Sequence, residues 1–400
     1  MSPPDEDLRI AMAAHKAERF DEAEAAYLRV LEARPDHAKA LYYLGLLQFH
    51  RGDTAAAITF VQRCLNSART SGPAWNTLGG LYIAAGRKVE ARDAYRRATV
   101  VAPAMGEAWY NYGICLRDEG DLEGAVSALR SGFTREPGYS RSYEALAILL
   151  YQMGRTQEAA DVYRDWAACE PRNPKARHMA AATSQRDVPA RAADDYVREL
   201  FDGAAKSFDA DLDKLNYRAP DLVAAALVEE AGALSAKKFQ SVLDAGCGTG
   251  LCGPLVRAHC VRLVGVDLSP KMVERASARG CYDQVFAAEL SSFMRSRAGG
   301  FDAIVSADTL VYFGALEEPL RAAREALSAG GVLIFTLESL PATASESYRL
   351  EAHGRYSHSE PYIRSALAAA GFSLLAFSAA TLREERDAPV SGAVIAARRV

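Results

Sequence analysis

The sequence predicts an array of helical repeats followed by an α/β domain with a parallel sheet, and three observations support this. Similar residues recur every 34 positions through about the first 173 residues. A short apolar segment that begins near Phe239 leads into a glycine-rich loop. Beyond that loop, strand-like apolar segments alternate with helix-like segments. We therefore expect two parts of different architecture.

Composition limits the class of protein. The 400 residues are 50% apolar and carry a formal net charge of −4, which suits two or three globular domains and gives no basic surface for nucleic acid. The first residues do not resemble a signal peptide, and the uncharged segment 365–382 is typical of helix, turn and strand rather than of a membrane span. Seven cysteines without a CxxC pair favour a reducing compartment over a disulfide framework or a zinc site. We expect a cytoplasmic protein that binds no metal, membrane or nucleic acid.

The repeat is defined by residues of one kind at fixed positions. Prolines 103, 137 and 171 are 34 residues apart, and Arg69 occupies the position where the same period would place another proline. In paired antiparallel helices, small residues lie where the helices cross most closely, and large apolar residues fill the gap to the next pair. Alanine occupies one position of the period in five successive units: Ala23, Ala57, Ala91, Ala125 and Ala159.

The third unit carries residues that resemble the tetratricopeptide repeat: Trp75, Leu78, Gly79, Tyr82, Ala91, Tyr95, Ala98 and Pro103. The resemblance covers five units, and with a capping helix it implies an α-solenoid over residues 4–180. In this family the inner face, built from the first helix of each unit, often holds a peptide. Five residues are the candidates for binding a protein or peptide partner there: Tyr42, Tyr43, Asn76, Tyr110 and Asn111. The alternative is that the aromatic residues pack between units or against the second half of the chain.

A strand and loop typical of nucleotide binding begin the second part. The strand ends in Asp244 and is followed by three alternating glycines: Gly246, Gly248 and Gly250. Glycines let a ligand approach the backbone where a side chain would collide. Gly248, Gly250 and Gly253 also match the dinucleotide pattern GxGxxG. Asp244 favours a different ligand, because a carboxylate would repel a pyrophosphate but attract an ammonium group.

A second apolar strand ends in Asp267, where a carboxylate can accept both ribose hydroxyls. Together these motifs resemble the class I S-adenosylmethionine-dependent methyltransferases, which implies a Rossmann-like, seven-stranded α/β domain over residues 236–400. The resemblance implies S-adenosylmethionine as cofactor, with Asp244 and the glycines at its methionyl end, Asp267 at the ribose and Glu289, at the end of the third strand, at the adenine. The expected cofactor-binding residues are Asp244, Gly246, Cys247, Gly248, Gly250, Asp267, Leu268, Glu289, Leu290, Phe208 and Tyr217.

Residues 181–235 are expected to link the two parts and to form a helical lid. Phe201, Ala205, Phe208 and Leu212 recur at the spacing of one helical stripe. In many methyl-transfer enzymes the segment before the first strand covers the cofactor, which implies a lid role for Phe208 and Tyr217. The alternative is a simple docking surface for the next domain.

Candidate catalytic residues lie where the later strands end. They are Asp308, Tyr312, Tyr356 and His358. The unperturbed pKa of a histidine side chain suits a general base, which favours His358 for that role. Alternatively, Asp308 caps a helix or binds the cofactor, Tyr312 packs in the core and His358 lies on the surface. The fourth strand is followed by SADT rather than by Asn-Pro-Pro, which does not favour methylation of adenine or of glutamine amides.

The overall resemblance is to bacterial methyltransferases that carry tetratricopeptide repeats, a group with no single substrate. We expect an enzyme whose repeats recruit a protein, peptide or carrier-bound methyl acceptor. One alternative is a small-molecule acceptor, with the repeats used for dimerisation or as a wall of the pocket. The other is a non-catalytic scaffold that binds the cofactor.

Overall fold

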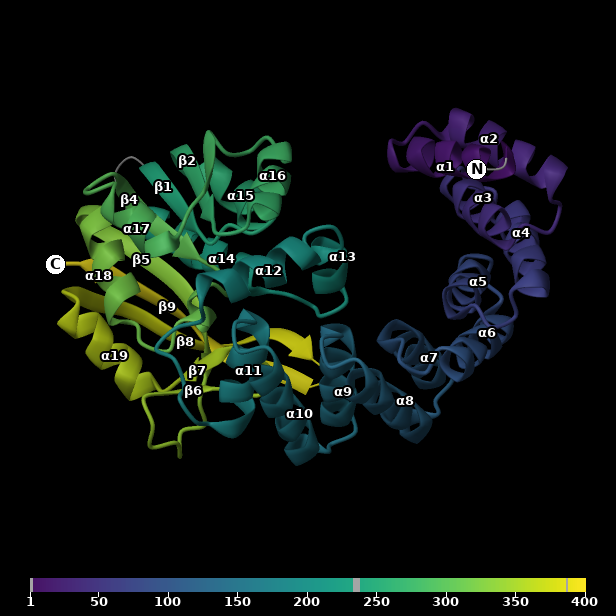
Figure 1. Cartoon of the computed structure of the whole chain (residues 1–400). Helices are drawn as coiled ribbons and strands as arrows, with labels where there is room; N and C mark the ends of the chain where they lie inside the picture. The colour runs from purple at the N-terminus through teal and green to yellow at the C-terminus, as the bar shows by residue number, and fades with distance from the viewer. Residues whose placement is uncertain (1–2, 233–237, 386–387) are drawn as a thin grey trace. The chain divides into compact units, whose positions relative to one another are not determined.

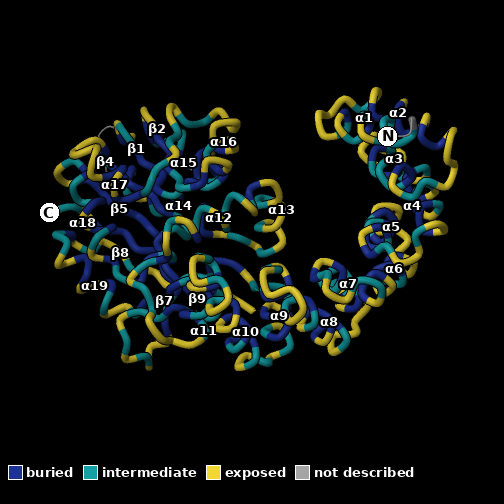
Figure 2. Tube along the Cα trace, in the orientation of Figure 1, coloured by how far each residue is buried: buried dark blue, intermediate teal, exposed yellow. Residues whose placement is uncertain are grey.

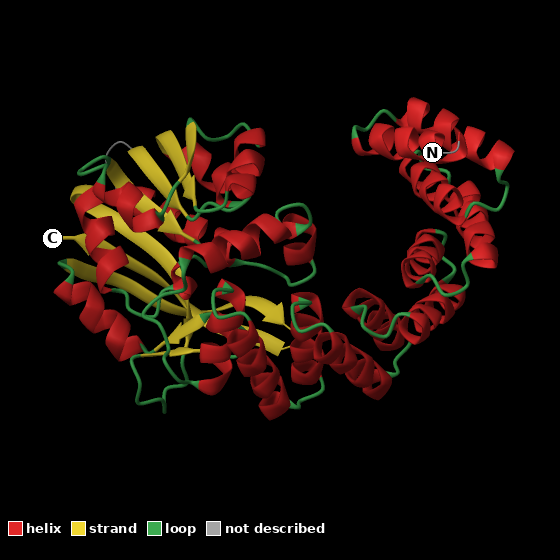
Figure 3. Cartoon of the chain, in the orientation of Figure 1, coloured by secondary structure: helices red, strands yellow, loops and turns green. Residues whose placement is uncertain are grey.

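The computed structural model describes residues 3–232, 238–385 and 388–400 (Figure 1). The chain divides into two compact units, Met1–Pro171 and Arg172–Val400. The first unit is helical, and the second contains every strand of the described residues (Figure 3). None of the helices in these ranges combines the length and the apolar character that crossing a membrane requires.

The first unit consists of five helix pairs, as the period of 34 predicts. The pairs are α1 (Pro3–Lys16) with α2 (Phe20–Ala33), α3 (Ala38–His50) with α4 (Thr54–Ser67), α5 (Gly72–Ala84) with α6 (Lys88–Val101), α7 (Gly106–Asp118) with α8 (Leu122–Arg135), and α9 (Ser140–Gln152) with α10 (Thr156–Cys169). Small residues allow close crossing: a Cβ on Gly79 would lie 2.5 Å from the ring of Tyr95. Within this unit the odd-numbered helices line the inner side of the curve and the even-numbered helices the outer side (Figure 1).

The second unit is built around one sheet. Its strands are β1 (Phe239–Ala245), β2 (Cys260–Asp267), β3 (Gln284–Ala287), β4 (Phe301–Ser306), β5 (Leu327–Ser339), β6 (Tyr348–Leu350), β7 (Tyr356–His358), β8 (Phe372–Glu385) and β9 (Ala388–Arg399). The main order is β3-β2-β1-β4-β5-β9-β8, parallel from β3 to β5 and antiparallel beyond. This is the expected seven-stranded arrangement, with the short pair β7-β6 added at the end of β5.

Helices complete the second unit. They are α11 (Pro174–Ser184), α12 (Asp194–Ala204), α13 (Phe208–Asp213), α14 (Ala219–Gly232), α15 (Cys252–Val256), α16 (Pro270–Ala278), α17 (Leu290–Arg295), α18 (Glu317–Ala326) and α19 (Glu360–Ala369). Successive residues of β1 enter different cores: Val242 packs on the face covered by α14 and α15, and Leu243 on the face covered by α17, α18 and α19. Both are fully buried, as expected for a parallel strand covered on both faces (Figure 2).

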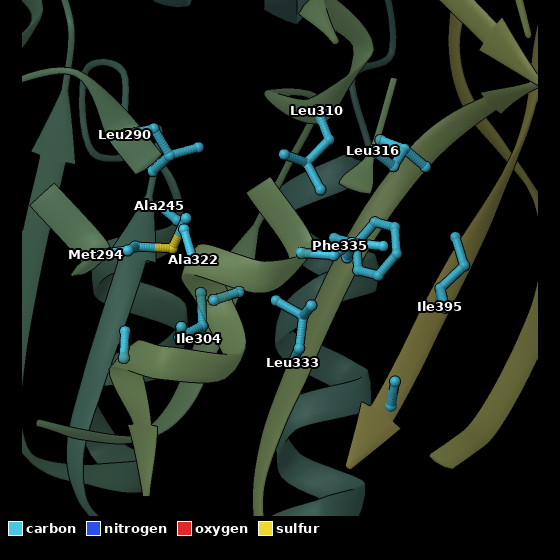
Figure 4. Packing of buried hydrophobic residues seen from close by; sticks show 14 of the residues in the cluster. Ala245, Leu290, Met294, Ile304, Leu310, Leu316, Ala322, Leu333, Phe335 and Ile395 are labelled. Carbon is cyan, nitrogen blue, oxygen red and sulfur yellow. The ribbon is translucent and has the colours of Figure 1, made fainter. Parts of the chain in front are cut away.

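Figure 4 shows the second of these cores, where Ile304 of β4, Leu333 and Phe335 of β5 and Ile395 of β9 pack together. Leu310 lies just beyond the end of β4 and buries its side chain in the same core. This apolar layer holds the strand ends rigid, and the polar residues that follow those ends are positioned by it.

The helix expected to cap the repeat array groups with the second unit instead. In α11, the imidazole Nε2 of His178 is 2.9 Å from the carbonyl oxygen of Gly354, and its ring stacks on Tyr196 at 4.1 Å. Gln185, at the end of the helix, donates to the carbonyl of Leu350. These partners lie in α12 and around β6 and β7, and the compact division of the chain falls after Pro171.

Candidate active site

A cavity of about 240 Å³ lies at the carboxyl ends of β1, β2 and β4, beneath α12 and α13. In open α/β sheets this edge is where ligands bind, because the strand order reverses there and leaves a crevice. The cavity brings together eleven of the sequence-predicted site residues: Gly246, Cys247, Gly248, Asp267, Leu268, Glu289, Leu290, Phe208, Tyr217, Asp308 and Tyr312.

Two glycines of the loop after β1 are required by their surroundings. Gly246 has a φ of 77°, and a Cβ there would lie 2.1 Å from the hydroxyl of Thr309. Gly250 has a φ of 88°, and a Cβ there would lie 2.9 Å from the ring of Tyr282. Gly250 does not line the cavity, so its part in a cofactor site is to shape the loop rather than to touch the ligand.

Asp267 ends β2 and faces the cavity. One carboxylate oxygen accepts a hydrogen bond from the backbone N–H of Gly248 at 2.9 Å, and the other accepts one from Ser269 at 2.8 Å. Burial raises the pKa of Asp267, while these two N–H groups oppose the rise. A carboxylate has about four lone-pair sites, so Asp267 keeps capacity for donors from a ligand.

Asp244 lies behind the glycine loop and not on the cavity wall, which corrects the expected direct contact with the methionyl end. It is completely buried, and one of its oxygens accepts a hydrogen bond from the hydroxyl of Tyr282 at 2.6 Å. Its other oxygen, Oδ1, has no hydrogen-bond partner among the described residues. Burial raises the pKa of Asp244 to about 7, opposed by Tyr282. Its contribution to the site is therefore indirect, through the loop in front of it.

Glu289 follows β3, which ends at Ala287 rather than at the expected position near Glu289. Its carboxylate caps α17 by accepting the backbone N–H groups of Ser291 and Ser292, and Arg191 reaches it at 2.9 Å. Burial by itself raises the pKa of Glu289, but these hydrogen bonds and Arg191 lower it overall. Arg191 also lines the cavity and lies over the ring of Phe313, a position that the sequence pattern did not indicate.

The lid segment forms two helices rather than one continuous stripe. Asp202 in α12 accepts a hydrogen bond from the hydroxyl of Ser269, and Asp209 in α13 accepts one from Thr249 of the glycine loop at 2.5 Å. The break between α12 and α13 lets Phe201 and Phe208 both face the cavity, with their ring centroids 5.9 Å apart. Asp202 and Asp209, each one residue after a phenylalanine, thus anchor α12 and α13, while Phe201 and Phe208 line the cavity.

Asp308 lies just beyond the end of β4, on the cavity wall, in an unusual backbone conformation. Its φ is 50°, in the left-handed region that non-glycine residues rarely adopt and that often marks functional sites. Its carboxylate accepts hydrogen bonds from the hydroxyl of Thr336 at 2.9 Å and from Arg383 at 2.5 Å. Burial raises the pKa of Asp308, against the opposing charge of Arg383.

Asp308 belongs to a buried ionic cluster. Arg383 also contacts Glu338 and Glu385, and Arg355 donates to the same two carboxylates at 2.6 Å each. Three carboxylates therefore face two guanidinium groups, and the formal charge of these five side chains is −1. Residues 355, 383 and 385 line the cavity together with Tyr312, whereas Glu338 lies behind the wall.

Two candidate catalytic residues lie outside the cavity, so we withdraw them. His358 is fully buried in β7, and its Nε2 is 3.1 Å from the carbonyl oxygen of Gly314. Burial lowers the pKa of His358 to about 4, which makes it a weak base at neutral pH. The hydroxyl of Tyr356 donates to the carbonyl of Pro189 at 2.7 Å. Both residues hold the β6-β7 pair against neighbouring segments.

Four of the five candidate partner-binding residues of the repeat array contact a residue of a neighbouring odd-numbered helix, and the fifth, Tyr43, contacts Tyr27 of α2. The hydroxyl of Tyr42 lies 3.0 Å from that of Thr77, and the amide of Asn111 donates to Asn76 at 2.9 Å. Tyr43 stacks on Tyr27. In addition, the guanidinium of Arg141 lies 4.4 Å from the ring centroid of Tyr110. These contacts agree with the alternative of packing between units, and they occupy polar atoms that a bound peptide would otherwise use.

Comparisons with known proteins agree with these two architectures. A family model described as a methyltransferase domain matches residues 214–376, and tetratricopeptide repeat models match residues 8–73, 76–132 and 116–182. The chain carries tetratricopeptide repeats and a class I methyltransferase domain. The match to the methyltransferase model begins upstream of β1 and includes α14.

Similar proteins fall into the same two groups. Tetratricopeptide repeat protein 8 of Caenorhabditis elegans is 28% identical over 146 residues, which are 36% of this chain and 29% of that protein. Methyltransferase-like protein 27 of Homo sapiens is 37% identical over 109 residues, which are 26% of this chain and 43% of that protein. The chain thus spans less than half the length of either relative. The solved structure of magnesium protoporphyrin IX methyltransferase from Synechocystis PCC 6803 aligns with a TM-score of 0.34 at 22% identity, covering 45% of this chain and 78% of that one.

Proposed function

We propose that the methyltransferase domain binds S-adenosylmethionine in the cavity and transfers its methyl group to an acceptor at the end occupied by Asp308 and Tyr312. The observation that carries the proposal is the cavity itself, which gathers the glycine loop, Asp267, Glu289 and Asp308 at one edge of the sheet. S-adenosylmethionine supplies an electrophilic methyl group on a positively charged sulfonium.

The residues present fit this cofactor. Asp267 faces the cavity with lone pairs left over after its two backbone hydrogen bonds, which suits a ribose with two hydroxyl donors. The Cβ position of Gly248 is open except for the ring of Phe208 at 3.8 Å, so this backbone can be approached closely. Aromatic rings of Phe201 and Tyr312, with centroids 5.5 Å apart, and the carboxylate of Asp308 suit a sulfonium.

Asp308 is the residue that we assign to the acceptor. Methyl transfer from a sulfonium is an in-line displacement, so the protein must align the nucleophile and accept a proton where the acceptor carries one. The carboxylate of Asp308 is held by Thr336 and Arg383, and its raised pKa makes it a better proton acceptor than an ordinary aspartate. Phe201 and Phe208 line the same space, and their rings would shield it from water with the cofactor bound.

The tetratricopeptide repeats are proposed to recruit a protein, peptide or carrier-bound acceptor. Their support is the array of five units in the same chain as the transferase. The test is incubation of the full chain with host lysate and radiolabelled S-adenosylmethionine, followed by separation of macromolecules from small molecules. Label in macromolecules that disappears with Asp308→Asn supports the proposal.

Other outcomes of the labelling experiment select the alternatives. Label only in small molecules would assign a small-molecule acceptor and leave the repeats to dimerisation or to the pocket wall. No label in either fraction, with binding of S-adenosylhomocysteine retained, would show a scaffold that binds the cofactor without turnover.

A further inference from the structure

The repeat array carries a groove on its outer side that none of the preceding functions uses. It has a volume of about 710 Å³ and lies between α4 and α6, with residues of α5 forming its floor. Leu65 and Leu78 are buried at its base, and Trp75 is half-buried beside them. The even-numbered helices form the outer side of this unit (Figure 1), so the groove is separate from the inner face.

Three arginines surround this groove without acidic partners. Arg69, Arg96 and Arg97 are exposed, and the residues that line the groove include no aspartate or glutamate. Within the described parts of the chain, none of the three forms an ion pair. Other array arginines do, as Arg92 with Glu119 at 2.9 Å. The groove is therefore a local excess of positive charge on a chain whose net charge is −4.

The aromatic wall of the groove is fixed in place. The indole N–H of Trp75 donates to the backbone carbonyl of Arg69 at 2.8 Å, and the guanidinium of Arg97 lies 5.1 Å from the ring centroid of Trp75. Val100 adds an apolar rim and is 71% exposed. The groove thus combines cations without acidic partners, a rigid aromatic side chain and an exposed aliphatic side chain, which together can receive a segment with both carboxylates and an apolar side chain.

The repeat architecture does not require these residues. At the next interface, 34 residues on, Trp109 makes the same hydrogen bond to the carbonyl of Pro103 at 2.9 Å, and the guanidinium of Arg135 lies 5.3 Å from its ring centroid, so the indole is held in a similar way. There, however, proline replaces Arg69 and Ser131 replaces Arg97, while Arg130, which corresponds to Arg96, is paired with Glu158. Arg69 occupies the position where the period of 34 predicts a proline, and it supplies one of the cations of this interface.

We propose that this outer groove binds an acidic segment of a protein partner, through the three arginines and through packing of an apolar side chain on Trp75 and Val100. Charge complementarity selects an acidic ligand, and the aromatic and aliphatic wall selects a peptide over a simple anion. The assignment concerns the repeat array alone, and it stands whether or not the second unit transfers methyl groups.

The test is binding of a synthetic fluorescein-labelled peptide, composed of aspartate and glutamate around one central leucine, to the full chain by fluorescence anisotropy. The wild type is expected to bind it, with affinity that falls as salt is raised. The triple variant Arg69→Gln/Arg96→Gln/Arg97→Gln is expected to weaken binding by about tenfold or more, and Trp75→Ala to weaken it by at least about threefold.

A matched triple variant controls for net charge. Arg9→Gln/Arg19→Gln/Arg164→Gln removes the same charge from three exposed array arginines that are each paired with an acid three residues away, and binding should stay within about twofold. Circular dichroism of each variant verifies that the array is folded. Absence of binding to the wild type, equal loss in both triple variants, or tighter binding of a single-stranded RNA oligonucleotide than of the peptide would overturn the proposal.

Discussion

Arg383 joins Asp308 to the rest of the buried ionic cluster from a strand 75 residues further along the chain. Asp308 itself could be predicted, since it follows directly after an apolar strand. Arg383 could not, because its approach depends on the register of β8 with β9 and of β9 with β5. The same limit applies to His358: its sequence neighbours suggested the surface, yet pairing of β7 with β5 and β6 buries it.

The burial of His358 predicts a pH dependence of stability. Its pKa is about 4 in the folded chain and 6.5 in a free side chain, so between these values the unfolded state binds more protons. The contribution of the neutral, buried His358 to the free energy of unfolding is therefore complete above pH 6.5 and is lost as the pH falls toward 4. At pH 5 the loss is about 2 kcal/mol.

Urea unfolding from pH 7 to pH 5 measures this effect. His358→Phe cannot take up the proton, so its free energy of unfolding should fall less than that of the wild type over this range. His259 is a histidine in a surface 3-10 turn, and His259→Phe is the matched control that should follow the wild type. Parallel curves for His358→Phe and wild type would contradict the assignment.

The lid shows what periodicity can and cannot predict for an element. The apolar spacing from Phe201 to Leu212 correctly placed a helical, cavity-facing segment before β1. It could not show the break after Ala204, because that break depends on two side-chain anchors, Asp202 on Ser269 and Asp209 on Thr249. The third strand ends at Ala287, earlier than expected, because Glu289 caps the helix that follows.

Loss of the second anchor is expected to loosen the lid. Asp209 accepts hydrogen bonds from both Thr249 and Arg279, so Asp209→Ala should release α13 from the glycine loop. We expect faster amide exchange over residues 205–214 and dissociation of S-adenosylhomocysteine faster by about fivefold or more in stopped-flow displacement.

Asp211 provides the control for this variant, because it lies in the same helix and its hydrogen bonds are local, to Lys214 and Ser207. Asp211→Ala should leave both rates within about twofold of the wild type. If Asp209→Ala leaves exchange and dissociation unchanged, the anchor does not hold the lid.

The molecule as a whole consists of two compact units of different construction. The repeat period and the strand–loop pattern predicted both architectures, since each architecture leaves a regular pattern of residue types in the sequence. The boundary between the two units could not be predicted in the same way. Helix α11 has the composition of a terminal repeat helix, but it packs through His178 and Gln185 on residues near Gly354 and Leu350. Helix type is a local property, whereas the surface that a helix docks on is not.

Two units imply two unfolding transitions. Differential scanning calorimetry of the full chain is expected to resolve one transition for the array and one for the second unit. S-adenosylhomocysteine binds only the second unit in this account, so it should raise one transition temperature and leave the other unchanged. A single transition, or an equal shift of both, would show that the units unfold together.

Binding of S-adenosylhomocysteine measured by isothermal titration calorimetry tests the central claim, that the cavity at the strand ends holds the cofactor through Asp267. The wild type should bind one molecule per chain, and Asp267→Ala should weaken binding by about 10- to 100-fold, as expected for the loss of hydrogen bonds to a charged group. Asp283→Ala is the matched control, since that carboxylate also accepts a backbone N–H but lies outside the cavity. Wild-type affinity in Asp267→Ala, or no binding to the wild type, would contradict the claim.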